Sequence, residues 1–392
     1  MFIYNFTLQV RKVNFIMLNN KPIYMDNNAT TKVDDLVLEA IWPYYNQFYG
    51  NASSNLHAYG WEAKAATETH IEQIAGLIGC EPHELIITSG ATESINLAIK
   101  GIAEAYKSKG NHIITCETEH KAVLDVLKVL EKFGYEISYL SVNKEGLIDL
   151  EELKSAIRTT SIMVCIMSVN NETGVMQDIE SIAQACNQND VFFFSDVTQH
   201  VGKLKLNVKE IGLACASFSA HKFHGPKGIG ALYLSSKNPR VNIIEQINGG
   251  GHQNKKRSGT LNVPGIVGMA TALKLFDENY WEITAHVSKI KNYFEHQLLD
   301  VDGLRINGST KHRIYNTSNI FFPEKCDLKL LKQRFAFASG SACSSASDEP
   351  SHVLKAMSIP IQEIKGSYRF SFSKHNTLDD VKLFVKMLKE IL

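Results

Sequence analysis

Apolar segments alternate with helix-like segments between residues 84 and 234, and this alternation constrains the fold more than any other feature. Helical periodicity separates several of the apolar segments, for example at 122–133 and 149–157. Strands that alternate with helices predict a largely parallel sheet covered by helices, with ligands at the carboxyl ends of the strands. Seven segments have the length and composition of strands: Leu85–Thr88, His112–Thr115, Glu136–Val142, Ile162–Val169, Val191–Ser195, Ala214–Phe218 and Ile229–Leu234.

The chain is long enough for more than one domain. With 392 residues, 44% of them hydrophobic and 21% charged, it can bury a large core, and we expect two domains. After the glycine-rich turn at 248–251 the alternation ends, and a helical stretch at Val263–Leu299 precedes a smaller segment of mixed type. We therefore predict an α/β fold, in which a large domain built on a mostly parallel seven-stranded sheet is accompanied by a smaller α+β domain.

Charge and cysteine spacing exclude several classes of partner. The 41 basic and 41 acidic residues cancel, so no overall field attracts nucleic acid, and we expect no direct nucleic-acid binding. No apolar run approaches the roughly 20 residues of a membrane helix, so we expect no membrane association. The seven cysteines include no Cys-x-x-Cys pair, and we therefore expect no metal site.

One lysine lies in a tight polar turn between two of the apolar segments. Lys222 belongs to the turn Ser219–Gly228, in which Gly225, Pro226 and Gly228 supply a rigid mount. A lysine amine that forms a Schiff base with an aldehyde cofactor must be partly desolvated and held in place, and this turn suits that use. The alternative is a solvated surface lysine, which is what most lysines are.

Two further turns end apolar segments in the same part of the chain. Phe192–Gln199 leads into the carboxylate of Asp196, which could face the ring nitrogen of pyridoxal phosphate or could cap a helix. Leu85–Ser94 leads into a glycine turn and then a helix, whose free N–H groups and hydroxyls could bind a phosphate. Ordinary capping by Thr92 and Ser94 is the alternative for that turn.

These three turns, together with further motifs, resemble those of the cysteine desulfurases of the NifS and IscS type, within the fold-type I pyridoxal phosphate enzymes. Eight motifs run in family order: Tyr24–Thr31, Thr88–Ser94, Glu117–Val123, Asn170–Val175, Asp196–Gln199, Ser219–Gly228, Arg257–Leu261 and Ser339–Ser345. The resemblance implies a large pyridoxal phosphate domain at 32–275 and a small domain at 276–392, which carries the catalytic cysteine loop and which the N-terminal segment 1–31 joins. It also implies conversion of L-cysteine to L-alanine.

The resemblance assigns roles to residues around the cofactor. Lys222 should hold pyridoxal phosphate and then move the Cα proton of the substrate, while Asp196 should pair with the ring nitrogen. Gln199 should bind the phenolic oxygen, and His120 should stack on the ring, although a capping or core histidine is the alternative. Further cofactor contacts are expected from Ala91, Thr92, Ser219, His221 and, across a subunit boundary, Thr260.

The same resemblance assigns the substrate and the sulfur. Arg369 should bind the substrate carboxylate, helped by Asn171, although a salt bridge within a strand is the alternative. Cys343 lies in a loop of small residues, Ala338–Ser347, that can carry a thiolate to the substrate sulfur and keep it as a persulfide. A sulfur acceptor is then required, such as an iron–sulfur scaffold or a tRNA-thiolation relay. Cys80, Cys116, Cys165, Cys186 and Cys215 are expected to be buried and inert, and Cys326 has no assigned role.

Some features depart from the family or leave alternatives open. Val197 replaces the usual alanine and Ala52 replaces a usual proline beside an apparent insertion, which puts catalytic efficiency in doubt. We expect translation to start at Met17, a cytoplasmic location and a homodimer. Another reaction of the same cofactor, such as transamination or selenocysteine lysis, remains the enzymatic alternative. A non-catalytic partner protein that retains the fold is the alternative outside enzymes.

Overall fold

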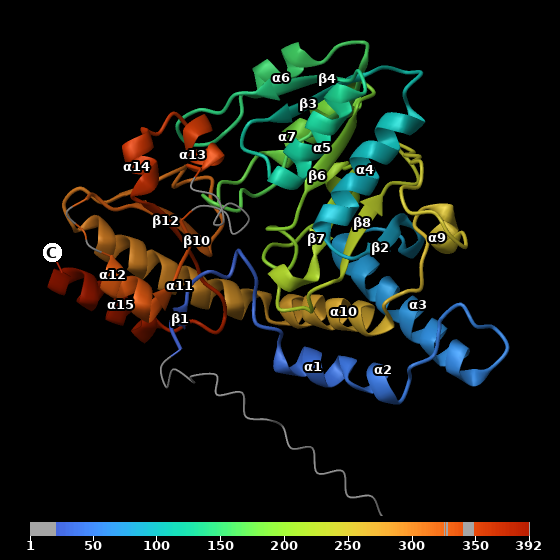
Figure 1. The fold of residues 1–392 in the computed structure, drawn as a ribbon, viewed down its shortest axis with the longest axis horizontal. Coiled ribbons are helices and arrows are strands. Elements are labelled where there is room, and N and C mark those ends of the chain that lie inside the picture. Colours follow the sequence, from blue (N-terminus) through green and yellow to red (C-terminus); the bar gives the residue numbers. More distant parts are fainter. Residues whose placement is uncertain (1–20, 325, 327, 340–348, 392) are drawn as a thin grey trace, which may run out of the picture.

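The computed structural model describes residues 21–324, 326, 328–339 and 349–391. Its largest sheet has the strand order β2-β8-β7-β6-β5-β3-β4. β8 is antiparallel to both of its neighbours, and the other adjacent pairs are parallel (Figure 1). The seven strands are β2 (Leu85–Thr88), β3 (His112–Cys116), β4 (Glu136–Leu140), β5 (Ser161–Cys165), β6 (Phe192–Asp196), β7 (Cys215–Ser219) and β8 (Gly230–Leu234). The predicted seven-stranded, mostly parallel sheet is confirmed.

Helices cover both faces of this sheet because alternate side chains of each strand point to opposite faces. Phe192 and Phe194 belong to the core on the face covered by α4 (Ala91–Ala105) and α5 (Lys121–Lys132). Phe193 belongs to the core on the other face. That second face is covered by α1 (Asp35–Ile41), α3 (Ala58–Ile78), α6 (Leu150–Ala156), α7 (Ile179–Gln188) and α10 (Val263–Glu278). Burial on both faces explains why the strands are near-continuous apolar runs.

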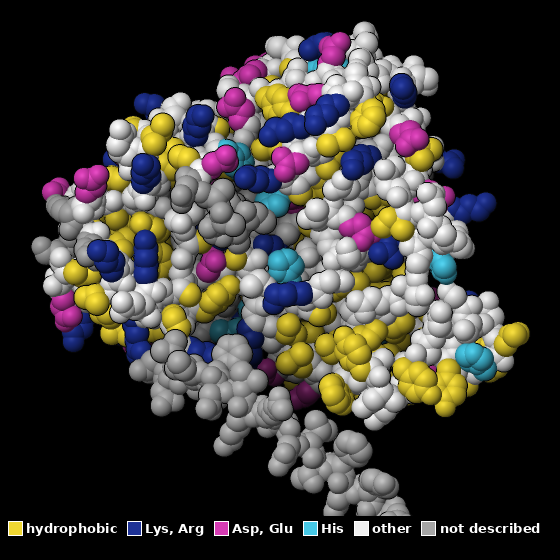
Figure 2. All heavy atoms as spheres, viewed as in Figure 1, with side chains coloured by type: hydrophobic (Ala, Val, Ile, Leu, Met, Phe, Trp, Pro, Cys, Tyr) yellow, Lys and Arg dark blue, Asp and Glu magenta, His cyan; other side chains and the backbone are white. Residues whose placement is uncertain are grey.

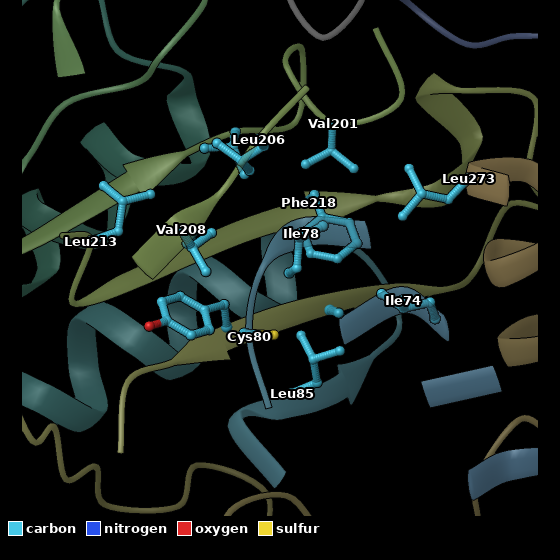
Figure 3. Packing of buried hydrophobic residues seen from close by; sticks show 14 of the residues in the cluster. Ile74, Ile78, Cys80, Leu85, Val201, Leu206, Val208, Leu213, Phe218 and Leu273 are labelled. Carbon is cyan, nitrogen blue, oxygen red and sulfur yellow. The ribbon is translucent and has the colours of Figure 1, made fainter. Parts of the chain in front are cut away.

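Figure 3 shows part of the second core, where segments far apart in the sequence meet. Ile78 of α3 lies beside Phe218 of β7, while Ile74 of α3 and Leu273 of α10 lie at the edge of the group. Cys80 lies in the same cluster and is buried, as are Cys116, Cys165, Cys186, Cys215 and Cys326. The prediction of buried cysteines is therefore confirmed, and Cys326 is buried as well despite its polar neighbours.

The C-terminal part of the chain forms a separate, aromatic-rich core beside the large sheet (Figure 1). The ring of Phe294 packs there against three other rings, with its centroid 4.9 to 5.3 Å from those of Phe370, Phe372 and Phe384. Its strands are β9 (Arg305–Ile306), β10 (Thr317–Phe321) and β12 (Ser367–Ser371), which pair antiparallel in the order β12-β10-β9. Its longest helices are α11 (Tyr280–Leu299) and α15 (Leu378–Ile391).

The N-terminal segment pairs with this C-terminal part. β1 (Ile23–Tyr24) lies parallel to β11 (Phe335–Ala336), and Asp26 forms a parallel bridge with Ser371. The division into 1–31, 32–275 and 276–392 stays a prediction, although this pairing is the contact that it requires.

The predicted helical stretch at 263–299 consists of two helices that meet at Asn279. The Asn279 side chain donates a hydrogen bond to the Leu275 carbonyl at 2.8 Å, and its backbone is not helical. The remaining elements are α2 (Pro43–Asn46), η1 (Pro82–Glu84), α8 (Val208–Ile211), η2 (Ala220–Lys222), α9 (His252–Lys255), α12 (Lys329–Arg334), α13 (His352–Ala356) and α14 (Ile361–Lys365). Within the described part of the chain, no helix combines the length and the apolar character needed to cross a membrane.

Candidate active site

A cavity of about 500 Å³ opens at the carboxyl ends of the parallel strands. These ends lie at one edge of the sheet, which is where a parallel sheet with helical crossovers places its ligands. Most of the residues predicted from the sequence line this cavity: Ala91, Thr92, His120, Asn171, Asp196, Gln199, Ser219, His221, Lys222 and Arg369. Thr260 is exposed and is not among the lining residues. Cys343 lies outside the described residues.

Lys222 ends the short η2 helix that follows β7, and its amine is held by the N-terminal segment. Lys222 Nζ donates hydrogen bonds to the carbonyl oxygens of Asn28 at 2.7 Å and Ala29 at 2.8 Å. The turn itself is fixed because the backbone N–H and the hydroxyl of Thr31 both donate to the His221 carbonyl at 2.9 Å. Neither Asn28 nor Ala29 was given a role from the sequence, although both belong to a motif that was noted there.

Asp196 is the last residue of β6, and only 7% of it is exposed. One carboxylate oxygen, Oδ1, accepts the Thr198 N–H at 2.9 Å, which fixes the rotamer at the cavity wall. Glu119, a fully buried residue that sequence reasoning missed, lies close enough to interact with the charge of Asp196. Burial raises the pKa of Glu119 well above its usual value, and the neighbouring charge of Asp196 raises it further. The raised pKa favours the protonated form of Glu119 behind this wall of the cavity.

His120 caps a helix, which was the alternative given from the sequence, and it also lines the cavity. Its Nδ1 accepts the Ala122 N–H at 3.1 Å and caps α5, while the ring lines the cavity. A capping bond of this kind holds the imidazole in one orientation. The cap therefore positions the ring rather than competing with a role in the cavity.

The glycine turn after β2 brings the N-terminus of α4 to the cavity. Gly90 has φ +152° and ψ 179°, a backbone conformation that is open essentially only to glycine. The Ser89 N–H donates to the Glu93 carboxylate at 2.7 Å, and Arg257 pairs with the same carboxylate at 2.7 Å. The turn is thus fixed from two sides, and the partial positive charge of the helix N-terminus faces the cavity lining at Thr92.

His221 contributes a neutral ring to the same wall. Burial lowers its pKa to about 4, and the positive charges of Lys222, Lys227 and Lys203 lower it further. Its Nδ1 lies 3.1 Å from the Thr30 hydroxyl. At neutral pH this residue can donate a hydrogen bond to an anion but adds no charge.

Arg369 supplies a buried guanidinium to the opposite wall. Only 1% of the residue is exposed. Its Nη1 donates to the Asn171 carbonyl at 2.9 Å, and its Nη2 donates to Asp26 Oδ1 at 2.6 Å. Its Nε is buried without a hydrogen-bond partner among the described residues. The predicted salt-bridge alternative is therefore present as well, and the guanidinium keeps donor capacity beside the cavity.

The donor set fits pyridoxal phosphate, the cofactor that the sequence resemblance implies. The cofactor has an aldehyde, a ring nitrogen that must be kept protonated, and a phosphate. Lys222 supplies an amine, Asp196 supplies a buried carboxylate, and the glycine turn supplies a helix N-terminus. An ideal Cβ at Gly90 would lie 3.4 Å from the Ser219 hydroxyl, so the turn brings this predicted phosphate contact close to the start of α4. Among the described residues, no three His, Cys, Asp or Glu side chains gather as metal ligands would.

Comparison with known proteins identifies the family of the chain. The class-V aminotransferase family matches residues 23–384. The cysteine desulfurase IscS of Mannheimia succiniciproducens is 45% identical over 372 residues, covering 94% of this chain and 92% of that protein. The IscS of Neisseria meningitidis is 45% identical over 370 residues, covering 94% and 91%.

Solved structures give the same result. A NifS-like protein superimposes with a TM-score of 0.87 at 35% identity, covering 95% of this chain and 99% of its own. The structure of "SspA in complex with cysteine" has a TM-score of 0.81 at 32% identity, covering 91% and 100%. The resemblance found in the sequence is confirmed, and the chain belongs to the class-V aminotransferase family.

Proposed function

We propose that this protein is a pyridoxal phosphate-dependent cysteine desulfurase, which converts L-cysteine to L-alanine and hands the sulfur to an acceptor. The observation that carries the proposal is the meeting of Lys222, Asp196 and Arg369 around one cavity of about 500 Å³. A lysine, a buried carboxylate and a buried guanidinium supply the covalent mount, the ring partner and the carboxylate anchor that an amino acid substrate needs. Relatives that are 45% identical over 94% of the chain are desulfurases.

The protein residues have separate tasks in this reaction. The bound cofactor withdraws electrons from the substrate carbon. Lys222 would hold the cofactor, and its amine would take and return the proton at the substrate Cα. The buried carboxylate of Asp196 would pair with the ring nitrogen and favour its protonated form. Arg369 orients the substrate through its carboxylate.

Cys343 is the residue to which we assign the sulfur. A thiolate on Cys343 attacks the sulfur of the bound substrate to form an S–S bond, and the carbon–sulfur bond breaks with its electron pair left on the substrate carbon. That carbon takes up a proton and becomes the methyl group of alanine, while Cys343 keeps the sulfur as a persulfide. This step separates desulfuration from transamination, because a transaminase needs no reactive thiol.

We further propose that the active protein is a homodimer. Thr260, a predicted phosphate contact, is exposed and lies outside the cavity lining, which suits a residue that serves the partner's cavity. The region from α1 to the start of α3 carries exposed aromatic side chains, and hydrophobic groups gather over that edge in Figure 2. They are Trp42, Tyr45, Tyr49, Tyr59 and Trp61. A patch of this kind is typical of a protein interface. An iron–sulfur scaffold as sulfur acceptor and a cytoplasmic location also stay predictions.

The test of the proposed function is the variant Cys343→Ala. It should still bind pyridoxal phosphate and change its visible spectrum with L-cysteine, because the groups that bind cofactor and substrate are untouched. Release of alanine from L-cysteine should fall to background. Cys326→Ala is the matched control, since Cys326 is buried in the C-terminal core and should leave turnover near normal. Near-normal alanine release by the Cys343 variant, without added thiols, would overturn the proposal.

A further inference from the structure

A second lysine, Lys203, lies buried behind the active-site cavity. It is 5% exposed and comes four residues after Gln199 in the sequence. The Lys203 N–H donates a hydrogen bond to the His200 carbonyl at 3.0 Å. Its Nζ donates to Gln199 Oε1 and to Asn28 Oδ1, the latter at 3.2 Å. Both acceptors are neutral amides, and no ion pair of Lys203 is present in the described part of the chain.

Hydrogen bonds connect Lys203 to the lysine that mounts the cofactor. Gln199 Nε2 donates to the Asn28 carbonyl oxygen at 3.0 Å. Lys222 Nζ donates to that same oxygen at 2.7 Å. Lys203, Gln199, Asn28 and Lys222 therefore form one continuous chain of contacts. Lys203 and Lys222 also line a second, small cavity of about 40 Å³ behind the site.

The surroundings of Lys203 favour an uncharged amine. Burial lowers its pKa well below the ordinary value, and the charges of Lys222 and Arg369 lower it further. The small cavity is also lined by Asp34, Lys374 and His224, but the Asp34 carboxylate is paired with Lys374. A neutral amine has two N–H donors, and Lys203 contacts two acceptors. The match leaves no buried donor without a partner.

Burying an amine among neutral groups has a cost that an apolar side chain of the same size would avoid. The amine has one effect that an apolar side chain could not have, because it sets the orientation of the Gln199 side-chain amide. The oxygen and nitrogen of a glutamine amide are nearly equal in size, so only the donors and acceptors around them decide which atom faces which way. A donor at Oε1 forces the Gln199 nitrogen toward the Asn28 carbonyl and the cavity.

We propose that Lys203 is a positioning residue of the active site, which holds the Gln199 amide with its nitrogen toward the cofactor and, through the Asn28 carbonyl, places the amine of Lys222. The inference rests on the proposed function, because it assumes that Gln199 faces bound pyridoxal phosphate. Lys203 itself touches neither cofactor nor substrate in this role.

The variant Lys203→Met tests the proposal in the holoenzyme. The pH midpoint of the visible absorbance of the bound cofactor should move by about half a pH unit or more. Reloading of the apoprotein with pyridoxal phosphate should slow by about threefold or more, because Lys222 loses a fixed position. Lys205→Met makes the same change two residues away at an exposed lysine and should leave both readouts unchanged. An unmoved midpoint in folded Lys203→Met would overturn the inference.

A double variant asks whether Lys203 acts through Gln199. If it does, Lys203→Met should add almost nothing to the midpoint shift of Gln199→Met, whereas a merely structural lysine would add its own effect. Lys203→Gln keeps N–H donors and should recover most of the wild-type midpoint. Full additivity of the two substitutions would contradict the proposal.

Two outcomes separate this inference from the proposed function. A wild-type protein in which borohydride fixes no pyridoxal phosphate to Lys222 would contradict the proposed function itself. A normal wild type beside unchanged Lys203 variants would contradict the inference alone. If no Lys203 variant folds, a crystal structure of the wild-type holoenzyme decides: Lys203 Nζ bonded to Gln199 Oε1 supports the inference, and a carboxylate against Nζ overturns it.

Discussion

At the scale of single residues, two histidines beside Lys222 are neutral at pH 7. Burial lowers the pKa of His224 to about 4, and the charges of His375 and Lys374 add to the effect. Burial likewise lowers the pKa of His221 to about 4. The unfolded chain therefore binds more protons than the folded chain between the ordinary value of 6.5 and pH 4. Stability is full above that window and is lost as the pH falls through it.

The variant His224→Asn should make the apoprotein less sensitive to acid. The backbone of His224 has φ +67°, which asparagine tolerates, and an asparagine amide can replace the bond from Nδ1 to the Lys32 carbonyl. Wild type should lose about 2 kcal/mol more than the variant between pH 7 and pH 5, measured by urea unfolding. His83→Asn changes an exposed histidine and should behave as wild type. Equal losses in all three proteins would refute this origin of acid sensitivity.

At the scale of elements, the turn between β2 and α4 depends on glycine at two positions. Gly90 needs its special backbone conformation to aim the N-terminus of α4 at the cavity. Gly230 of β8 lies against that turn, since a Cβ there would come within 2.7 Å of Gly90 Cα. The strand next to the turn is therefore shaped to leave room for it.

The variant Gly90→Ala should weaken binding of pyridoxal phosphate. The forced backbone conformation costs about 1 to 3 kcal/mol, and relaxing it turns the free N–H groups away from the phosphate. We expect roughly a tenfold higher dissociation constant in a spectroscopic titration of the apoprotein. Gly76→Ala in α3 is the control, because a Cβ there meets no atom within 4 Å. It should keep cofactor affinity and gain up to about 1 kcal/mol of stability. Unchanged affinity in Gly90→Ala would show that the turn does not bind the phosphate.

At the scale of the whole molecule, exposed aromatic side chains gather between the end of α1 and the start of α3. Trp42 lies between α1 and α2 and is 65% exposed, and Tyr45 of α2 is 62% exposed. Burying aromatic side chains of this size contributes strongly to association. A second copy of the chain would cover the patch by two-fold symmetry.

The double variant Trp42→Glu and Tyr45→Glu should dissociate the proposed dimer, because two carboxylates would have to be buried in the interface. Sedimentation equilibrium should show twice the chain mass for wild type and the single chain mass for the variant. The cofactor content of the variant should also fall, if Thr260 contributes to the partner's cavity. Trp281→Glu alters an equally exposed aromatic side chain on α11 and should stay dimeric. A wild type that is active as a monomer would disprove the assembly.

The sequence by itself determined the strands, the helices around them and the strand ends that carry Asp196 and Lys222. These are local properties, since periodicity and turn residues act over a few neighbours in the chain. It also determined the family, because eight motifs in order are a property of the chain alone. It could not determine the direction of β8, because the same apolar run can pair parallel or antiparallel.

Only the tertiary structure decided what holds the reactive groups. Asp26 and Arg369 are 343 residues apart, yet they form an ion pair that orients the predicted substrate anchor. Lys203 reads as an ordinary charged residue in the sequence, and its burial beside Gln199 follows only from packing the large sheet against the N-terminal segment. Contacts of this kind are set by which elements meet in space, and no pattern of neighbouring residues records them.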